Sequence, residues 1–166
     1  MSTSPYAAMS KDCLLEKVSA LLDGSALDIA AFQIAIEGKL GVVVRADIED
    51  LLKILDALRN CSELQFEQMI DLFGADVRDL IELTYRLRSI ENNVDLIVKC
   101  ELPYGAHYSS VGKVYPAAWL PERELCEMFG LFLLDHPNPK RLLTTEGMPP
   151  FLRKVTTIRS KEEIWG

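Results

Sequence analysis

The chain has 166 residues, of which 49% are hydrophobic and 26% charged; this is the composition of one folded domain and excludes an intrinsically disordered protein. Its formal net charge of −7 argues against nucleic-acid binding, because that task needs a basic face to displace counterions from phosphates. No apolar run approaches the ~20 residues that span a bilayer, and residues 1–10 lack the pattern of a secretory signal. We therefore expect a protein that stays in the cytoplasm and reaches a membrane only through partners.

Two amphipathic helices are predicted in the first 60 residues. Apolar residues recur at helical spacing from Leu14 to Leu22, with Ser10 as a candidate N-cap and Gly24 at the end. The second helix follows Asp47 as its candidate cap, and its core face runs through residues 51–58. Between them, alternation in 32–36 and the apolar run 42–44 predict two strands joined by a turn, a pattern that favours a hairpin.

The clearest strand signal lies in residues 81–102. Apolar residues alternate with polar ones in 81–88 and again in 94–102, and an Asn92-Asn93 turn separates the two runs. This pattern is typical of an antiparallel hairpin with one face in water. Residues 65–72 fit either a helix or a strand, and the sheet that follows favours a strand. The predicted fold class is α+β, with two helices packed on one face of a mostly antiparallel sheet.

The sequence after Leu102 is rich in proline and leaves room for one short helix. Residues 137–166 hold six basic and three acidic residues, a net charge of +3, which leaves −10 for the rest of the chain. Residues 131–166 also contain many large apolar side chains, which a disordered tail normally lacks. An irregular surface loop or a frayed terminus is the alternative. We interpret residues 1–130 as an α+β domain and residues 131–166 as an extended docking arm.

The short helix is predicted in the stretch WLPERELCEMFG, with Pro121 in its first turn and Gly130 at its C-cap. Glu122 falls on the apolar side, so its carboxylate must cap backbone amides, pair with a cation or have a raised pKa. Arg123 opposes the helix dipole in the first turn, so we expect an acid to hold it, either Glu127 or a carboxylate of another chain.

Three stretches resemble a known family: YPAAWLPERELCEMFGLFLLDHPNPKRLL, LQFEQMIDLFGADV and YRLRSIENNVDLIVKCELP. Together they are similar, over roughly residues 40–154, to the thirty-kilodalton (C) subunit of respiratory complex I. The corresponding small subunits of membrane-bound, energy-converting nickel–iron hydrogenases and formate hydrogenlyases carry the same signature. Complex I members usually have aspartate at the position of Glu127, and an aspartate where this chain has Val155. These departures and the short length favour the hydrogenase branch over a quinone-reducing complex.

The resemblance implies a subunit without a cofactor in an electron-transfer complex coupled to ion translocation. Its partners would be the large catalytic subunit and iron–sulfur subunits of that complex, on the cytoplasmic side of the cell membrane. The residues expected to bind a partner or carry the motif are Glu122, Arg123, Glu124, Glu127, Met128, Phe129, Gly130, His136, Pro137, Arg141, Leu142, Arg153 and Lys154.

Catalytic and metal-binding interpretations have little support in the sequence. The four cysteines, Cys13, Cys61, Cys100 and Cys126, are widely spaced, which suits reduced thiols better than a zinc or iron–sulfur site. A nucleophilic Cys126 with His107 or His136 as base rests only on the presence of these residues. We expect His136 to be a hydrogen-bonded corner before Pro137. An independent binding module or assembly factor remains an alternative to a subunit.

Overall fold

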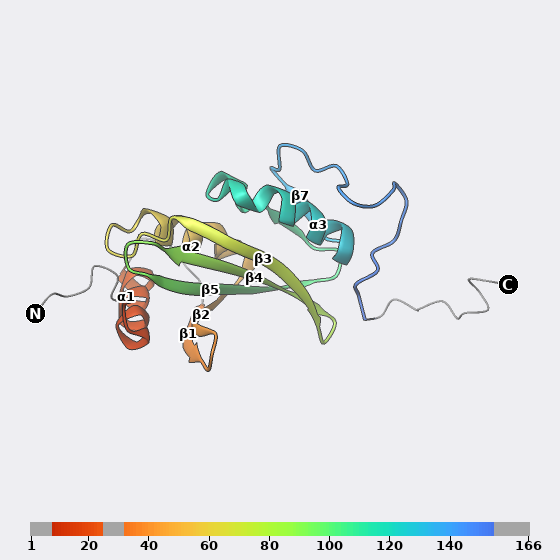
Figure 1. Cartoon of the computed structure of the whole chain (residues 1–166). Helices are drawn as coiled ribbons and strands as arrows, with labels where there is room; N and C mark the ends of the chain where they lie inside the picture. Colours follow the sequence, from red (N-terminus) through yellow and green to blue (C-terminus); the bar gives the residue numbers. More distant parts are fainter. Residues whose placement is uncertain (1–7, 25–31, 155–166) are drawn as a thin grey trace, which may run out of the picture.

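The computed structural model describes residues 8–24 and 32–154, which form a five-stranded sheet, a two-stranded sheet and helices (Figure 1). The helices are α1 (Lys11–Gly24), α2 (Ile48–Asn60) and α3 (Trp119–Phe129), with 3-10 turns η1 (Val111–Lys113) and η2 (Pro116–Ala118). The strands are β1 (Phe32–Glu37), β2 (Gly41–Ala46), β3 (Gln68–Val77), β4 (Leu80–Ser89), β5 (Val94–Pro103), β6 (His107–Ser109) and β7 (Phe132–Leu134).

The large sheet has the strand order β1-β2-β5-β4-β3. The hairpins β1–β2, β3–β4 and β4–β5 are antiparallel, whereas β2 and β5 pair in parallel. The parallel pair joins the N-terminal hairpin to the β3–β5 meander, with α2 in the connection. The α+β class and the mostly antiparallel sheet are confirmed.

The two N-terminal helices occur where the sequence predicts them. The side chain of Ser10 accepts a hydrogen bond from the amide of Cys13, as an N-cap does, and Leu14, Val18 and Leu22 are buried. Asp47 occupies the N-cap position of α2 without a side-chain capping bond. The buried face of α2 is Leu51, Ile54, Leu55 and Leu58, which follows the predicted helical spacing.

The third strand is confirmed as a strand, but it begins at Gln68 and not at Gln65. Gln65 has a positive φ of 46°, which interrupts an extended backbone, and Phe66 is buried before the strand begins. The β4–β5 hairpin turns at Asn93, also with a positive φ of 50°. An asparagine tolerates this conformation, so the turn is as the sequence indicates.

One face of the large sheet carries the hydrophobic core. Leu83, Tyr85 and Leu87 of β4 point into the same buried cluster as the apolar faces of α1, α2 and α3. Helix α3 lies along β3, and a Cβ placed on Gly74 would approach side-chain atoms of Leu125 and Phe129 to 2.9 Å. The glycine therefore lets the third helix pack closely on the sheet.

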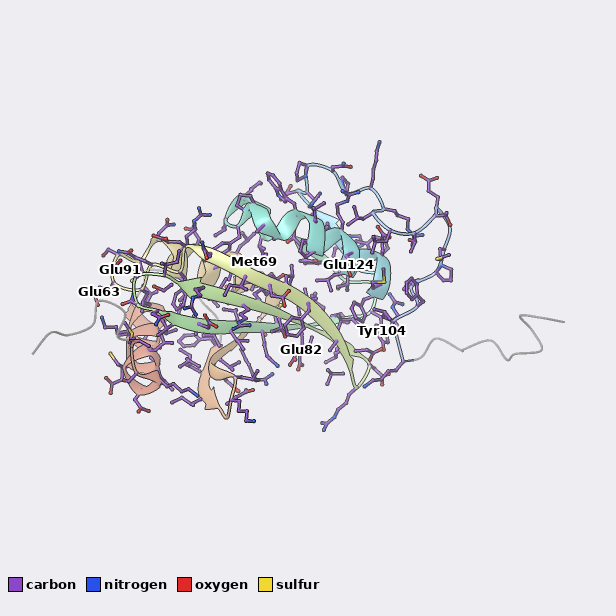
Figure 2. All side chains as sticks on the ribbon, in the orientation of Figure 1. Glu63, Met69, Glu82, Glu91, Tyr104 and Glu124 are labelled. Atoms are coloured by element: carbon purple, nitrogen blue, oxygen red, sulfur yellow. The ribbon has the colours of Figure 1, made fainter. Side chains whose placement is uncertain are left out.

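The opposite face of the sheet carries a network of ion pairs. Arg45 of β2 contacts Glu37 at 2.9 Å and Glu82 at 3.0 Å, and Lys99 of β5 contacts Glu82 at 2.7 Å. Glu82 is labelled in Figure 2 on this side of the meander. The pKa of Glu82 is lowered: burial opposes the shift, but the bonds from Lys99 and Arg45 outweigh it. The predicted face in water is therefore only partly exposed: its charges are paired, but Val43, Thr84 and Ile97 on the same face are buried.

The short parallel pair β6–β7 was not predicted from the sequence. It aligns His107 with Phe132 and Ser109 with Leu134, and the rings of His107 and Phe132 stack with centroids 4.7 Å apart. Leu131, the residue before β7, is buried. The start of the arm is thereby joined to the loop that follows β5.

Candidate functional site

Glu122 is completely buried and caps a loop of its own chain. Its Oε2 accepts a hydrogen bond from the Ser110 hydroxyl at 2.6 Å, and its Oε1 accepts one from the amide of Val111 at 2.7 Å. Ser110 in turn accepts a bond from the amide of Gly112 at 3.1 Å. Bonding to a backbone amide, one of the three possibilities for this carboxylate, is therefore observed.

Burial also raises the pKa of Glu122, although the bonds from Ser110 and Val111 lower it in part. Two opposing effects therefore set the pKa of this carboxyl group: desolvation disfavours its charged form, and the two hydrogen-bond donors favour it. Tyr85 and Tyr108 are buried nearby, and burial raises the pKa of both phenols. Glu122 belongs to the interior beneath α3 and has no exposed surface to offer a substrate.

Arg123 binds backbone carbonyls and not the expected acid. Its Nε donates to the carbonyl of Lys140 at 2.7 Å, and its Nη2 donates to the carbonyl of Arg141 at 3.0 Å. The expectation that Glu127 holds this guanidinium within the chain is wrong, because Glu127 is occupied elsewhere. Arginine suits this role, since its planar fork can reach two successive carbonyl oxygens.

Glu127 gathers three consecutive amides of the arm. Its carboxylate accepts hydrogen bonds from the amides of Leu142, Leu143 and Thr144, the last at 2.9 Å, and from the Thr144 hydroxyl at 2.9 Å. The residue is 4% exposed. Burial alone acts to raise the pKa of Glu127, but the amide of Leu143 and both groups of Thr144 lower it below its usual value. A cradle of successive amides is a typical anion site, and here a side chain fills it.

The remaining residues of the helix divide between core and solvent. Met128 and Phe129 are buried against the sheet, as expected for the apolar side of α3. Glu124 is exposed, and Figure 2 labels it on the helix. The three residues Glu122, Arg123 and Glu124 therefore point to three different environments and do not form one polar cluster.

The C-terminal end of α3 is capped by the arm. Gly130 has a φ of 67°, the left-handed conformation typical of a helix C-cap, which confirms its predicted position. The guanidinium of Arg153 donates to the carbonyls of Phe129 at 2.5 Å and of Gly130 at 3.0 Å. A cation here complements the negative end of the helix dipole. The amide of Leu152 donates to the carbonyl of Met128 at 3.1 Å.

Asp76 fixes the last described residues of the arm to the sheet. Its Oδ2 accepts hydrogen bonds from the amide of Lys154 at 2.6 Å and from the Tyr104 hydroxyl at 2.5 Å. Figure 2 labels Tyr104 at the end of the sheet beside the arm, and the Arg153 guanidinium lies 4.7 Å from its ring centroid. The Tyr104 bond and then the Lys154 bond lower the pKa of Asp76, and the same Tyr104 bond raises the pKa of Tyr104 to about 12.

His136 is a structural corner, as the sequence indicates. Its Nδ1 accepts a bond from the amide of Asn138 at 3.0 Å, so Nε2 carries the proton and donates to the carbonyl of Trp119 at 3.0 Å. Both ring nitrogens therefore form hydrogen bonds, while the neighbouring Pro137 is exposed. Arg141 organises the loop that follows, with donors to the carbonyls of Thr145 at 2.5 Å and Met148 at 2.6 Å.

The cysteines are free thiols, and Cys100 is the fully buried one while Cys13, Cys61 and Cys126 are half-buried. Burial raises the pKa of Cys100 and of Cys126 to about 12, which makes both poor nucleophiles. Within residues 8–24 and 32–154, no group of three histidine, cysteine or acidic side chains is placed to hold a metal ion.

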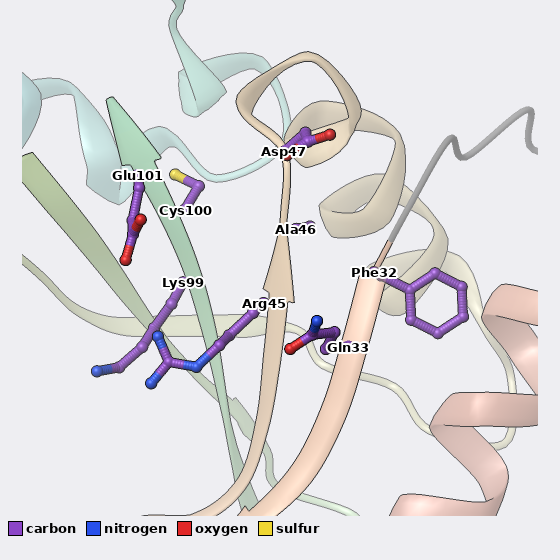
Figure 3. Close-up of a pocket in the computed structure, with 8 residues that line it drawn as sticks. All are labelled: Phe32, Gln33, Arg45, Ala46, Asp47, Lys99, Cys100 and Glu101. Carbon is purple, nitrogen blue, oxygen red and sulfur yellow. The ribbon is translucent and has the colours of Figure 1, made fainter. Parts of the chain in front are cut away.

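An open pocket of about 350 Å³ lies beside the start of β1 and the last residues of β2 and β5, next to the start of α2. Figure 3 shows Arg45 and Lys99 projecting together from neighbouring strands while Phe32 points away from them. Both cations are already paired with Glu37 or Glu82. A bound anion would have to compete with those carboxylates, so the candidate site is the surface of α3 and the arm.

Several residues of this site were missed in the sequence. Ser110, Thr144 and Tyr104 lie in irregular segments, where spacing carries no signal. Asp76 has a signal that alternation could reveal, because it shares the inward face of β3 with Leu72 and is 7% exposed. A charged residue at an inward strand position needs a partner.

Family comparison identifies the class of protein. The family model described as "Respiratory-chain NADH dehydrogenase, 30 Kd subunit" matches residues 44–162, which is well over half of the chain. This range begins within β2 and contains β3, β4, β5, α3 and the motif residues. The chain belongs to this family, as the sequence resemblance implies.

Curated relatives carry a consistent name. The C subunit of the NADH-quinone oxidoreductase of Bartonella bacilliformis is 36% identical over 137 residues, covering 81% of this chain and 62% of the relative. Its namesake in a Wolbachia species is 31% identical over 114 residues, covering 67% and 60%. The C/D subunit of the Shewanella woodyi enzyme is 35% identical over 146 residues, covering 78% and 23%. The chain thus spans about three fifths of the length of the first two relatives.

A solved structure shares the fold. The "Structure of the membrane-bound sulfane sulfur reductase (MBS), an archaeal respiratory membrane complex" contains a chain that matches with a TM-score of 0.61 and 21% identity. The match covers 73% of this chain and 70% of that one. At this identity the likeness concerns the fold alone.

Proposed function

We propose that this chain is the C-type subunit of a quinone-reducing respiratory complex of the NADH-quinone oxidoreductase type. The observation that carries the proposal is family membership together with the names of relatives that are 31 to 36% identical. The hydrogenase-type assignment, which rests on Glu127, Val155 and the short length, has less support than this alternative. Oxidoreductase chemistry coupled to ion translocation would belong to the complex as a whole.

The role proposed for the chain itself is structural and not catalytic. The polar groups that an enzyme would turn toward a substrate are engaged with this chain's own backbone. Glu122 binds Val111, Glu127 binds residues 142–144, and Arg123 binds two carbonyls of the arm. Their shared task is to fix irregular segments to α3, which is what a scaffold subunit needs.

The proposed partner surface is the outer side of the arm. Between residues 140 and 154 its exposed large apolar residues are Leu142, Leu143, Met148, Phe151 and Leu152, which are between 39% and 62% exposed. Exposed Lys140 and Lys154 flank them. An apolar surface with basic edges suits the large catalytic subunit or an iron–sulfur subunit that presents an apolar surface with acidic edges.

Membrane attachment through partners belongs to the same proposal. Within the described residues, no helix combines the length and the apolar character needed to cross a bilayer. A peripheral position on the cytoplasmic side of the cell membrane, held by the other subunits, follows from the proposed role.

Copurification tests the proposal. The full-length chain, tagged and expressed in its native host, is isolated from membranes in mild detergent, and the accompanying chains are identified by peptide mass. We expect subunits of a NADH-quinone oxidoreductase. Recovery with hydrogenase subunits would support the alternative branch, and recovery of the chain without partners would contradict a subunit role.

A further inference from the structure

Three charged side chains attach the arm to α3. In the first attachment, Arg123 donates to the carbonyls of Lys140 and Arg141. In the second, Glu127 accepts from the amides of residues 142–144. In the third, Arg153 donates to the carbonyls that end the helix. Each attachment joins a charged side chain to backbone groups, and such bonds are stronger than those between neutral groups.

The central attachment controls how the arm presents its apolar side chains. The amides of Leu142 and Leu143 point toward the Glu127 carboxylate, while their side chains are 39% and 62% exposed. The backbone is thereby held on the inner side and the two leucines face outward. A partner that binds a segment fixed in this way avoids the entropy cost of ordering it.

We propose that Glu127 is the positioning residue of the partner-binding surface: it orders residues 142–144 in the free chain, so that Leu142 and Leu143 form a preformed apolar contact for a partner subunit with an apolar groove edged by acids. This inference rests on the proposed function for the partner, but the ordering of the arm is a property of the chain alone. We assign acidic residues to the edge of the partner's groove because Lys140, next to the two leucines, is exposed and would face that edge.

The donors around Glu127 require a side chain with two acceptor oxygens, which a carboxylate provides. Four donors converge on two carboxylate oxygens, the amides of residues 142–144 and the Thr144 hydroxyl. Glutamine has nearly the same shape, but its NH2 group is a donor and would face these donors. Glu127→Gln therefore replaces one of the two acceptor oxygens with a donor, and leaves no large cavity. Glu124→Gln changes the same charge on an exposed position of the same helix and is the matched control.

Amide hydrogen exchange on the full-length free chain tests the ordering. We expect the amides of residues 142–144 to be protected, and to exchange about tenfold or more faster in Glu127→Gln than in wild type or Glu124→Gln. The β4–β5 hairpin reports whether each variant is folded. Should Glu127→Gln fail to fold, the wild-type chain is decisive by itself, because unprotected amides at 142–144 would overturn the proposal.

Assembly in the native host tests the surface. Leu142→Ser with Leu143→Ser should leave the amide protection of residues 142–144 unchanged and lower the amount of chain recovered with its partners about tenfold. Glu127→Gln should lower both protection and recovery. Normal recovery of the double serine variant would overturn the surface assignment. A wild-type chain without partners would instead count against the proposed function and leave the exchange result standing.

Discussion

Glu122 and Glu127 lie on the same short helix, both buried, and bind backbone amides of segments on opposite sides of it in the sequence. Glu122 binds Val111, before the helix, and Glu127 binds Leu143 and Thr144, after it. Burial raises the pKa of Glu122; for Glu127 burial acts in the same direction, but the arm's donors prevail and lower its pKa. The helix thus fixes the preceding loop and the following arm by the same kind of bond with opposite pH dependence.

The first prediction concerns Glu122. Glu122→Gln keeps an acceptor for Val111 and a donor for Ser110, so its unfolding free energy at pH 7 should stay within about 1 kcal/mol of wild type. Glu122→Ala leaves the Val111 amide and the Ser110 hydroxyl without this acceptor and creates a cavity. It should lower the unfolding free energy by about 3 kcal/mol. Urea unfolding followed by circular dichroism measures both.

A comparison of wild type with Glu122→Gln tests whether the pKa of Glu122 is raised. A carboxyl group whose pKa is higher in the folded state stabilises the fold most below its unfolded value, near 4.5, and loses that contribution as the pH rises through the folded pKa. Relative to Glu122→Gln, the wild type should therefore gain stability as the pH falls from 7 toward 4.5. A constant difference across this range would contradict the buried placement.

The second prediction concerns the contact between Gly112 and Trp119. A Cβ at Gly112 would lie 1.8 Å from the indole Nε1, so Gly112→Ala must displace the ring. We expect a loss of about 2 kcal/mol and a red shift of Trp119 fluorescence, measured with Trp165→Phe in the background. Gly24→Ala, where no atom lies within 4 Å of the new Cβ, is the control and should change neither. An unshifted spectrum in Gly112→Ala would refute this packing.

The third prediction concerns truncation after Asp135. Every described hydrophobic residue that is buried lies at or before Leu131, so the truncated chain should keep a cooperative unfolding transition. Its midpoint should fall, because Arg123 and Glu127 lose their partners in the arm. Association with partner subunits should be lost. A truncated chain that assembles normally would show that the arm is dispensable.

The fourth prediction concerns metals. The purified chain should contain no stoichiometric iron, nickel or zinc, since its cysteines are separate thiols, two of them with a pKa of about 12. Elemental analysis by mass spectrometry measures this directly. One bound equivalent that survives dialysis would contradict the interpretation of the cysteines.

Local patterns predicted much of the fold, and contacts between distant segments account for the rest. The alternation in β4 and β5 and the spacing in α2 identify these elements because each buries one face. The parallel pairing of β2 with β5 has no local signature, since it depends on how α2 crosses the sheet. Strands of three residues, such as β6 and β7, are too short for alternation to reveal.

Only part of the candidate site could likewise be predicted from the sequence. The position of Glu122 on an apolar face predicts amide donors, a cation or a raised pKa, and the structure shows donors together with a raised pKa. The partner of Arg123 was not predictable, because backbone carbonyls at residues 140–141 look the same in any sequence. The proline-rich arm offers no period from which its path along α3 can be derived.

The central claim is that the motif helix supports assembly and takes no part in catalysis. Arg123→Ala in the native host tests it most directly, by measuring both the amount of assembled complex and the NADH–quinone turnover for each assembled complex. Losing two charge-assisted bonds to the arm should lower the amount of complex about five- to tenfold, equivalent to about 1 kcal/mol, while turnover for each complex stays near that of wild type. Glu16→Ala, at an exposed position of α1 that is not among the motif residues, should change neither quantity. Normal assembly with lost turnover in Arg123→Ala would contradict the account.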